Sequence, residues 1–198
     1  MVKQYGFLIN TKDCYGCRTC SMACKSENVT PPGVLWRRVR EFNDDSPNTQ
    51  AFITMSCNHC DNPQCLKVCP ADTYTKRADG IVVQDHEKCI GCQMCIMACP
   101  YHAPVFDPAE GKTSKCNMCA ERLDEGLLPR CVESCPTGAI EFGDISELRK
   151  KHTTNWAVLE RRYNMPDHTI SHPNIVIIGM EDWSWILNIW SSLWYFSR

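Results

Sequence analysis

The residues with the clearest chemistry in this protein are sixteen cysteines, arranged in four groups of four. The third group follows the pattern CxxCxxCxxxCP, in which three closely spaced thiolates bind one cubane and the fourth binds a different cluster. Three of the four groups end in Cys-Pro. Four thiolates per cubane and no cysteine left over predict four 4Fe4S clusters. The groups are Cys14, Cys17, Cys20 and Cys24; Cys57, Cys60, Cys65 and Cys69; Cys89, Cys92, Cys95 and Cys99; and Cys116, Cys119, Cys131 and Cys135.

The other groups vary the spacing of the third. The first group keeps the close spacing but has Lys25 where the proline is expected. The second has a wider gap between Cys60 and Cys65, and the fourth has a long insertion between Cys119 and Cys131. The last two variations lie between ligands, and none of the three changes the number of thiolates.

Two structural roles compete with iron-sulfur binding. Disulfide frameworks occur mainly in much shorter secreted chains, and adjacent CxxC pairs make poor structural disulfides. Structural zinc uses two plus two ligands, whereas the third group supplies three plus one. His59 stands inside the second group, and using it as a ligand would leave a cysteine without a role. We therefore expect it to be a neighbour of a cluster.

The charge balance indicates no nucleic-acid partner, because 21 basic and 23 acidic side chains give a formal net charge of −2. Each oxidised cubane with four thiolates adds a charge of about −2. Lys12, Lys25, Lys88 and Lys115 stand beside the cysteine groups and are candidates to offset that charge. The alternative for each of them is an ordinary solvated lysine.

Short elements are expected around the cysteine groups, as in an α+β protein. Three-residue gaps at 20–24 and 95–99 favour helical turns, since such a gap places two thiolates on one helix face. Asp144 with Glu147 resembles a capping box that begins a helix through Lys151. A second helix is expected at 156–163, and hairpins are expected from 34–42 with 51–55 and from 72–76 with 80–84. Further strands are expected at 4–9, 137–142 and 173–178.

Spacing alone does not decide which groups share clusters. Sequential pairing joins the first group with the second and the third with the fourth. Nested pairing joins the first with the fourth and the second with the third. Both satisfy the rule that the last cysteine of a group binds the neighbouring cluster.

Four stretches resemble the iron-sulfur subunit of the dimethyl sulfoxide reductase family, which belongs to the complex iron-sulfur molybdoenzymes. They are Gln4-Tyr5-Gly6-Phe7, the run 56–60, Cys99-Pro100-Tyr101 and the run 131–136. The resemblance extends from about Gln4 to Ile177 and includes all sixteen cysteines. It implies nested pairing. The implied ligand sets are Cys14, Cys17, Cys20 and Cys135; Cys24, Cys116, Cys119 and Cys131; Cys57, Cys60, Cys65 and Cys99; and Cys69, Cys89, Cys92 and Cys95.

The resemblance also implies a domain organisation. Two nested modules similar to bacterial ferredoxins are expected, with short strands and helical turns around four clusters. The outer module comprises residues 1–56 and 103–150, and the inner module 57–102 is inserted into it. Residues 151–198 form a C-terminal extension.

We expect an electron-transfer role, because the sequence has no motif for bond-making catalysis and no catalytic residue is assigned. Scaling of size with length gives a molecule roughly 40 Å across, so four clusters lie on the order of 10 Å apart. The resemblance implies a molybdopterin-containing catalytic subunit and a quinol-binding membrane anchor as partners, in an anaerobic respiratory oxidoreductase. The alternatives are a subunit of a formate dehydrogenase or hydrogenase, or a stand-alone polyferredoxin.

The two ends of the sequence bear on location. No signal peptide is recognised at the start, so the resemblance implies a membrane-associated complex on the cytoplasmic face, or one exported with a signal-bearing partner. The tail 183–196 is rich in tryptophan and departs from the family. It is too short to cross a bilayer. We expect it to pack against this chain or a partner; the alternative is an interfacial membrane anchor, which the scarcity of lysine and arginine on its polar face disfavours.

Overall fold

A central three-stranded sheet organises the protein. The computed structural model describes residues 3–43 and 50–179. Strand β1 (Tyr5–Asn10) lies in the middle, antiparallel to β8 (Ile140–Asp144) and parallel to β9 (Ile175–Ile178). Residues Phe7 to Ile9 of β1 are buried. A central strand covered on both faces needs apolar residues at consecutive positions, which this run provides.

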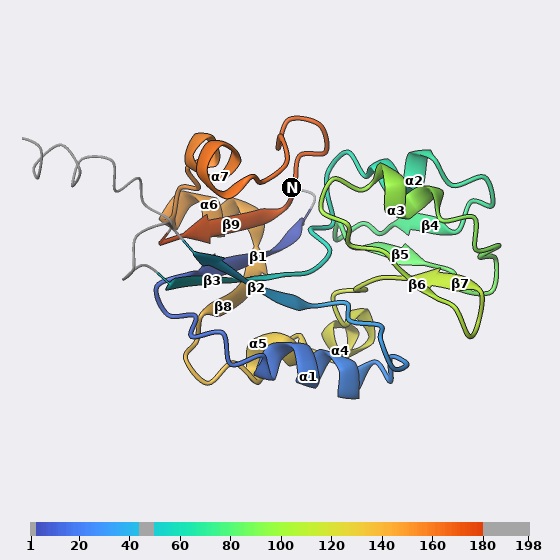
Figure 1. The fold of residues 1–198 in the computed structure, drawn as a ribbon, viewed down its shortest axis with the longest axis horizontal. Coiled ribbons are helices and arrows are strands. Elements are labelled where there is room, and N and C mark those ends of the chain that lie inside the picture. The colour runs from blue at the N-terminus through green and yellow to red at the C-terminus, as the bar shows by residue number, and fades with distance from the viewer. Residues whose placement is uncertain (1–2, 44–49, 180–198) are drawn as a thin grey trace, which may run out of the picture.

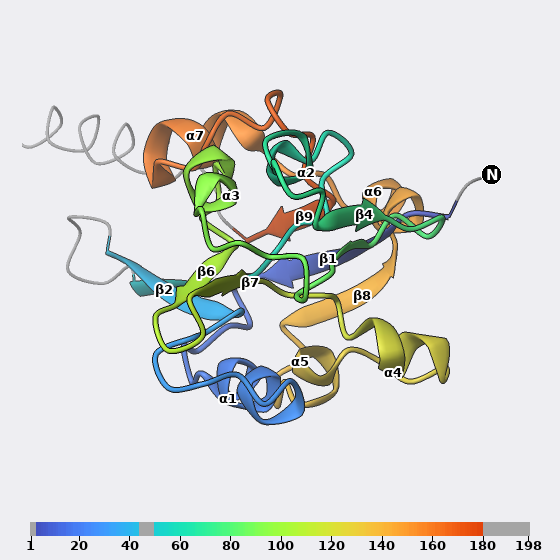
Figure 2. The same cartoon turned by 90° about the vertical axis from the view of Figure 1, so that its right-hand side faces the viewer.

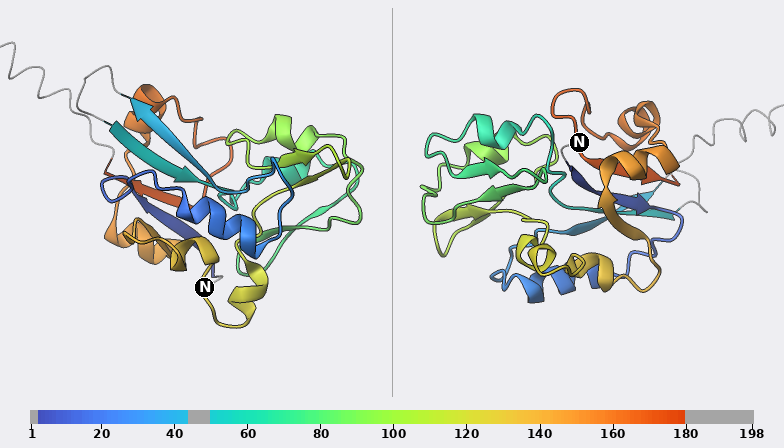
Figure 3. Two further views of the ribbon diagram at one scale, coloured as in Figure 1. Left: turned by 60° about the horizontal axis from the view of Figure 1, so that its bottom comes forward. Right: turned by 180° about the vertical axis from the view of Figure 1, so that it is seen from behind.

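Helices lie on both sides of this sheet (Figure 1). On one face is α6 (Ile145–Lys151). The larger core on the other face receives side chains from α1 (Thr19–Glu27), α4 (Ala120–Asp124), α5 (Arg130–Glu133) and α7 (Trp156–Tyr163). Figure 3 shows α1 beside α5, so the helices of the first and fourth cysteine groups are neighbours.

Alternating side chains of β1 enter two different apolar clusters. Leu8 packs with Ile145 and Leu148 of α6. Phe7 and Ile9 belong to the larger core, which also contains Cys20 of α1 and Cys131 of α5. The sheet therefore supports the cysteine-bearing helices from one face and is covered by α6 on the other.

Three hairpins complete the fold. They are β2 (Arg38–Asn43) with β3 (Gln50–Met55), β4 (Tyr74–Lys76) with β5 (Val82–Gln84), and β6 (Val105–Asp107) with β7 (Lys112–Ser114). The first two confirm the predicted hairpins, and the third was not predicted. Helix α2 (Gln64–Lys67) lies beside α3 (Met94–Ala98), on the side of the molecule that faces the viewer in Figure 2.

The predicted start of α6 is confirmed, although its capping differs from a capping box. The Asp144 carboxylate accepts hydrogen bonds from the backbone N–H and the hydroxyl of Ser146, at 2.8 and 2.5 Å. Glu147 does not complete the reciprocal bond, because its carboxylate accepts from Lys150 at 2.7 Å. Helix α7 has the predicted bounds, with Asn155 as its N-cap.

The described residues form an α+β fold, as predicted, with short strands and mostly short helices. Within 3–43 and 50–179, no helix has both the length and the apolar character needed to cross a membrane. The aromatic tail at 183–196 lies outside the described residues.

Candidate metal centres

All sixteen cysteines lie in the described part of the protein, and none forms a disulfide. Short helices carry many of them: Cys20 and Cys24 lie on α1, Cys65 on α2, Cys95 on α3 and Cys131 on α5. The remaining cysteines lie in the loops beside these helices. The disulfide alternative is therefore excluded for this structure.

The same backbone feature recurs in all four groups. The residue before the second cysteine has a positive φ: 71° at Gly16, 44° at His59, 69° at Gly91 and 60° at Met118. This conformation reverses the backbone direction, so that N–H groups point toward the ligands. The N–H groups of His59 and Met118 donate to the sulfurs of Cys57 and Cys116, at 3.5 and 3.3 Å. Successive N–H groups arranged in this way form a concave anion-binding loop.

The first centre contains three thiols of the first group and one of the fourth. The thiol of Cys14 interacts electrostatically with those of Cys20, Cys135 and Cys17. Burial raises the pKa of Cys14. Hydrogen bonds from the side chain and backbone of Thr19 lower the pKa of Cys17. This centre lies near the surface, because Cys17 is exposed and Cys14 and Cys135 are half-buried.

The second centre lies deeper. The thiol of Cys24 interacts with those of Cys116, Cys131 and Cys119. All four side chains are buried. Burial raises the pKa of Cys24 and raises that of Cys131 to about 11.

The third centre is a cavity lined by four thiols: Cys57, Cys60, Cys65 and Cys99. Burial raises the pKa values of Cys60 and Cys65 to about 12. His59 and Lys115 also line this cavity. Its ligands thus come from the second group and from the last cysteine of the third.

The fourth centre gathers around Thr113. The Thr113 hydroxyl lies 3.4 Å from the Cys89 sulfur and 3.5 Å from that of Cys95. Cys69 interacts electrostatically with Cys89. Cys92 is exposed and stands in the loop between Cys89 and α3.

The donor set fits thiolate-bound iron-sulfur clusters. Burial holds the interior thiols protonated, whereas a bound metal stabilises the thiolate. Several buried donors have no hydrogen-bond partner among the described residues, and two of them are Nε of Arg37 and Nε2 of His59. An anionic cluster supplies acceptors for such donors, and hydrogen bonds to sulfur are a known means of tuning clusters. The site residues therefore suit 4Fe4S clusters.

His59 has the position expected of a neighbour. It is 1% exposed, and its Nδ1 accepts from the backbone N–H of Val82 at 3.0 Å. Burial lowers its pKa well below the ordinary value, so the ring is neutral. With Nδ1 accepting, the ring proton lies on Nε2, the atom without a partner.

The four candidate lysines differ in their surroundings. Lys115 is 3% exposed and donates to the carbonyl oxygens of Val82 and Cys116. Lys25 donates to the carbonyl oxygens of Thr30 and Pro31, both at 2.6 Å. Lys88 is largely exposed and pairs with Asp85 at 3.2 Å. Lys12 also makes an interaction in the structure. Lys115 alone of the four is both buried and adjacent to a thiol cavity.

Sequence reasoning missed two kinds of residue. Threonines lie against sulfur in several centres: Thr73 Oγ1 is 3.2 Å from the Cys69 sulfur, and Thr54 Oγ1 is 3.4 Å from the Cys20 sulfur. Two such contacts could have been predicted from the runs Cys17-Arg18-Thr19 and Cys135-Pro136-Thr137, because Thr hydroxyls form hydrogen bonds readily with groups close in sequence. Arg37 is buried, and no pattern in the sequence indicated it.

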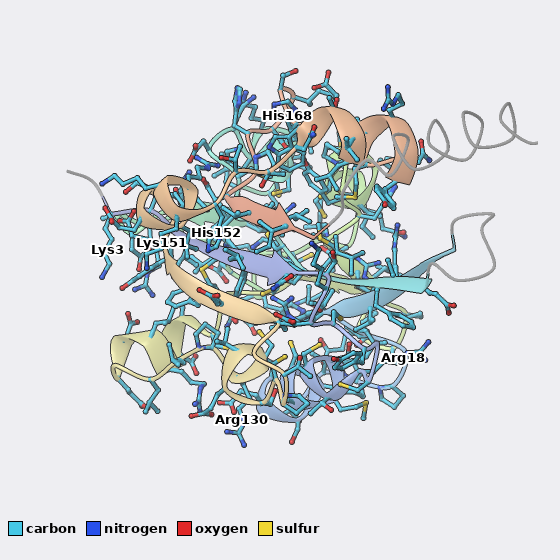
Figure 4. All side chains as sticks on the ribbon, turned by 90° about the vertical axis from the view of Figure 1, so that its left-hand side faces the viewer. Lys3, Arg18, Arg130, Lys151, His152 and His168 are labelled. Carbon is cyan, nitrogen blue, oxygen red and sulfur yellow. The ribbon has the colours of Figure 1, made fainter. Side chains whose placement is uncertain are left out.

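Two of the side chains labelled in Figure 4, Arg130 and His168, lie on opposite sides of the molecule. Arg130 stands on the side of α1 and α5, while His168 stands on the side of α7. Arg130 pairs with Glu133 at 2.5 Å, and His168 pairs with Glu160 at 2.7 Å.

Thiol groups held on short helices and in the loops beside them define an α+β iron-sulfur protein of the ferredoxin-like class. A protein-family profile described as a 4Fe-4S dicluster domain matches residues 49–145. The protein therefore binds 4Fe-4S clusters.

Curated relatives narrow this class. The protein is 46% identical over 187 residues to the probable anaerobic dimethyl sulfoxide reductase chain YnfG of Escherichia coli, and 45% identical to a chain of anaerobic dimethyl sulfoxide reductase from the same organism; each match covers 89% of both proteins. It is 40% identical to a subunit of tetrathionate reductase from Salmonella typhimurium, over 90% of its own length and 74% of that relative. The protein belongs to the iron-sulfur, electron-transfer subunits of the dimethyl sulfoxide reductase family.

Proposed function

We propose that this protein conducts electrons through four 4Fe4S clusters, between a quinol-binding membrane subunit and a molybdopterin-containing catalytic subunit. Each cluster accepts and donates one electron at a time when bound. The observation that carries the proposal is the continuous series of thiol centres. The names of the relatives, which are chains of reductases of sulfur compounds, support a place in a respiratory complex.

Neighbouring centres are connected by short protein links. Cys20 of the first centre and Cys24 of the second lie one turn apart on α1. Cys57 of the third centre packs in one apolar cluster with Cys116 of the second. Cys65 of the third and Cys95 of the fourth share another cluster with Tyr74. Each centre therefore adjoins the next, as a conductor requires.

The nested ligand sets are part of the proposal. Two electrostatic interactions support these sets, because each joins the first group to the fourth. They connect Cys14 with Cys135 and Cys24 with Cys131. The antiparallel pairing of β1 with β8 brings the same two parts of the sequence together. We propose that 57–102 forms an inner module, against which the 105–114 hairpin packs, inside an outer module formed by 1–56 and 103–150. Gln84 Nε2 donates to the Thr113 carbonyl oxygen at 2.7 Å across that contact.

Metal analysis of the anaerobically purified complex tests the cluster count. Four cubanes require close to sixteen iron and sixteen sulfide per chain. Zinc in place of iron, or about half that iron, contradicts the proposal.

Cysteine variants test the nesting. Cys17→Ser identifies the spectroscopic signal of the cluster bound by the first group, because Cys17 belongs to it under either pairing. Nesting requires Cys135→Ser to alter that same signal and Cys69→Ser to leave it intact. Sequential pairing requires the reverse. Reduction of the clusters by a quinol in native membranes, lost when the membrane subunit is removed, tests the proposed partners.

A further inference from the structure

Arg37 is a buried cation without a carboxylate partner among the described residues. It is 1% exposed. Its guanidinium donates to the hydroxyls of Thr54 and Ser56, at 3.2 and 2.9 Å, and lies 4.7 Å from the centre of the Phe7 ring. Burying an unpaired charge is costly, and a buried cation is retained where an anion lies close to it.

Two thiol centres surround this guanidinium. The thiols that interact most strongly with its charge are Cys131 and Cys116 of the second centre, followed by Cys20 of the first. The link to the first centre runs through Thr54, whose hydroxyl accepts from Arg37 and lies 3.4 Å from the Cys20 sulfur. Nε of Arg37 has no partner among the described residues. The anions that balance Arg37 are therefore the contents of these two centres.

We propose that Arg37 is the shared counter-charge of the first two clusters and raises the reduction potentials of both. The proposal rests on the proposed function. Reduction adds one negative charge to a cluster, and a fixed positive charge in a low-dielectric interior stabilises that added charge. The reduction potential of the second cluster should rise more than that of the first, because the two strongest thiol interactions of the guanidinium, with Cys131 and Cys116, and a weaker one with Cys24 belong to the second centre, whereas the first contributes Cys20 alone.

The third centre has its own buried cation. The Lys115 ammonium lies in the third cavity and attracts the thiols of Cys57 and Cys65. Arg37 should therefore have little influence on the third and fourth clusters. This separation makes the proposal specific, because each cluster serves as an internal reference for the others.

Redox titration of the intact complex, followed by electron paramagnetic resonance, tests the proposal. Arg37→Met removes the charge and should lower the equilibrium constant for reduction of the second cluster at least tenfold, about 59 mV for a one-electron couple. The first cluster should shift in the same direction by less. Thr54→Val removes the bridging hydroxyl and should shift the first cluster alone, whereas Thr54→Ser retains the hydroxyl and should restore the parent value.

Two arginine variants serve as controls. Arg40 is exposed on β2, so Arg40→Met removes the same charge from the surface. This variant should leave the equilibrium constants for reduction of all four clusters within threefold of the parent values. Arg37→Lys keeps a cation and should hold the first two clusters closer to the parent than Arg37→Met does. If Arg37→Met fails to assemble, a shift of tenfold or more in Arg37→Lys overturns the proposal, because the charge is still present.

The outcomes separate this proposal from the proposed function. Full iron content with unchanged potentials in Arg37→Met overturns the role of Arg37 and leaves the four-cluster conductor intact. A parent protein with fewer than four clusters overturns the proposed function itself. Equal shifts of all four clusters in Arg37→Met also overturn the proposal, since they indicate a general structural change.

Discussion

The side-chain amide of Asn174 donates to the carbonyl oxygen of His59 at 2.9 Å, across 115 positions of the sequence. The backbone N–H of Asn174 also donates to the carbonyl oxygen of Asn58, at 3.0 Å. Asn58 and His59 are the two residues between Cys57 and Cys60. The segment leading into β9 therefore holds the loop that supplies ligands to the third centre, and it connects that loop to the central sheet.

Asn174→Ala should destabilise this connection. Asn174 is 0% exposed, and its removal leaves the buried His59 carbonyl without a donor, at a cost of about 1–3 kcal/mol. We expect a lower melting temperature and faster loss of one cluster on dilution, measured by calorimetry and visible absorption. The control is Asn62→Ala, which removes a solvent-exposed hydrogen bond from the side-chain amide to the Ile170 carbonyl oxygen and should cost less than about 0.5 kcal/mol. Equal losses in the two variants contradict this prediction.

Gly91→Ala should prevent assembly of the fourth centre. A Cβ at this position would lie 1.9 Å from the carbonyl oxygen of Gly111, which no side-chain movement relieves. The matched control is Gly111→Ala, because Gly111 has a similar φ (66° against 69°) and an added Cβ there meets nothing within 4 Å. Iron should fall by about one quarter in Gly91→Ala and stay at the parent level in Gly111→Ala. Similar iron loss in both points to backbone conformation alone.

Thr113→Val should lower the reduction potential of the fourth cluster. Thr113 is 2% exposed and places its hydroxyl between the sulfurs of Cys89 and Cys95. Hydrogen bonds to the sulfurs stabilise the more negative, reduced state, so their loss favours the oxidised one. Redox titration should show a shift of that cluster alone, reversed in Thr113→Ser. An unchanged potential in Thr113→Val shows that the hydroxyl does not donate to sulfur.

Asp144→Ala should weaken the start of α6 without affecting any cluster. Loss of an N-cap costs about 1 kcal/mol, seen as a lower melting temperature with unchanged visible spectra. Hydrogen bonds from Ser146 hold the pKa of Asp144 below its ordinary value. The contribution is therefore present above the unfolded-state pKa and is lost as pH falls through the lower folded-state pKa. Glu147→Ala, which removes an exposed ion pair, should cost only a few tenths of a kcal/mol. A change in cluster spectra would place α6 closer to the metal centres than the structure does.

Local patterns in the sequence predicted the elements whose cause is local. Helix α7 begins after its Asn155 cap and spans the predicted residues, and α6 begins directly after Asp144, as its polar cap indicated. The hairpin from 72–84 followed from the Asp79-Gly80 turn between two short apolar runs. By contrast, β6 and β7 are three residues each, too short for a periodic pattern to be recognised.

Contacts between segments far apart in the sequence could not be predicted from local patterns. Nothing in the run before Ile178 indicated that β9 pairs in parallel with β1, since that pairing depends on the whole intervening sequence. Arginine is almost never fully buried without a partner, so its residue type gives no indication that Arg37 is buried. The spacing of the cysteines predicted the centres themselves, because ligand geometry constrains that spacing directly. The charges around them depend on packing between distant segments.

The central position of β1 has a consequence for biosynthesis. Strand β1 leaves the ribosome long before either β8 or β9, yet it lies between them in the finished sheet. Until the last strand is made, the run Phe7 to Ile9 lacks a full set of neighbours, and unpaired apolar strands associate readily with other polypeptides. The first strand of a nascent copy of this protein therefore stays without its native neighbours for most of the time that synthesis takes.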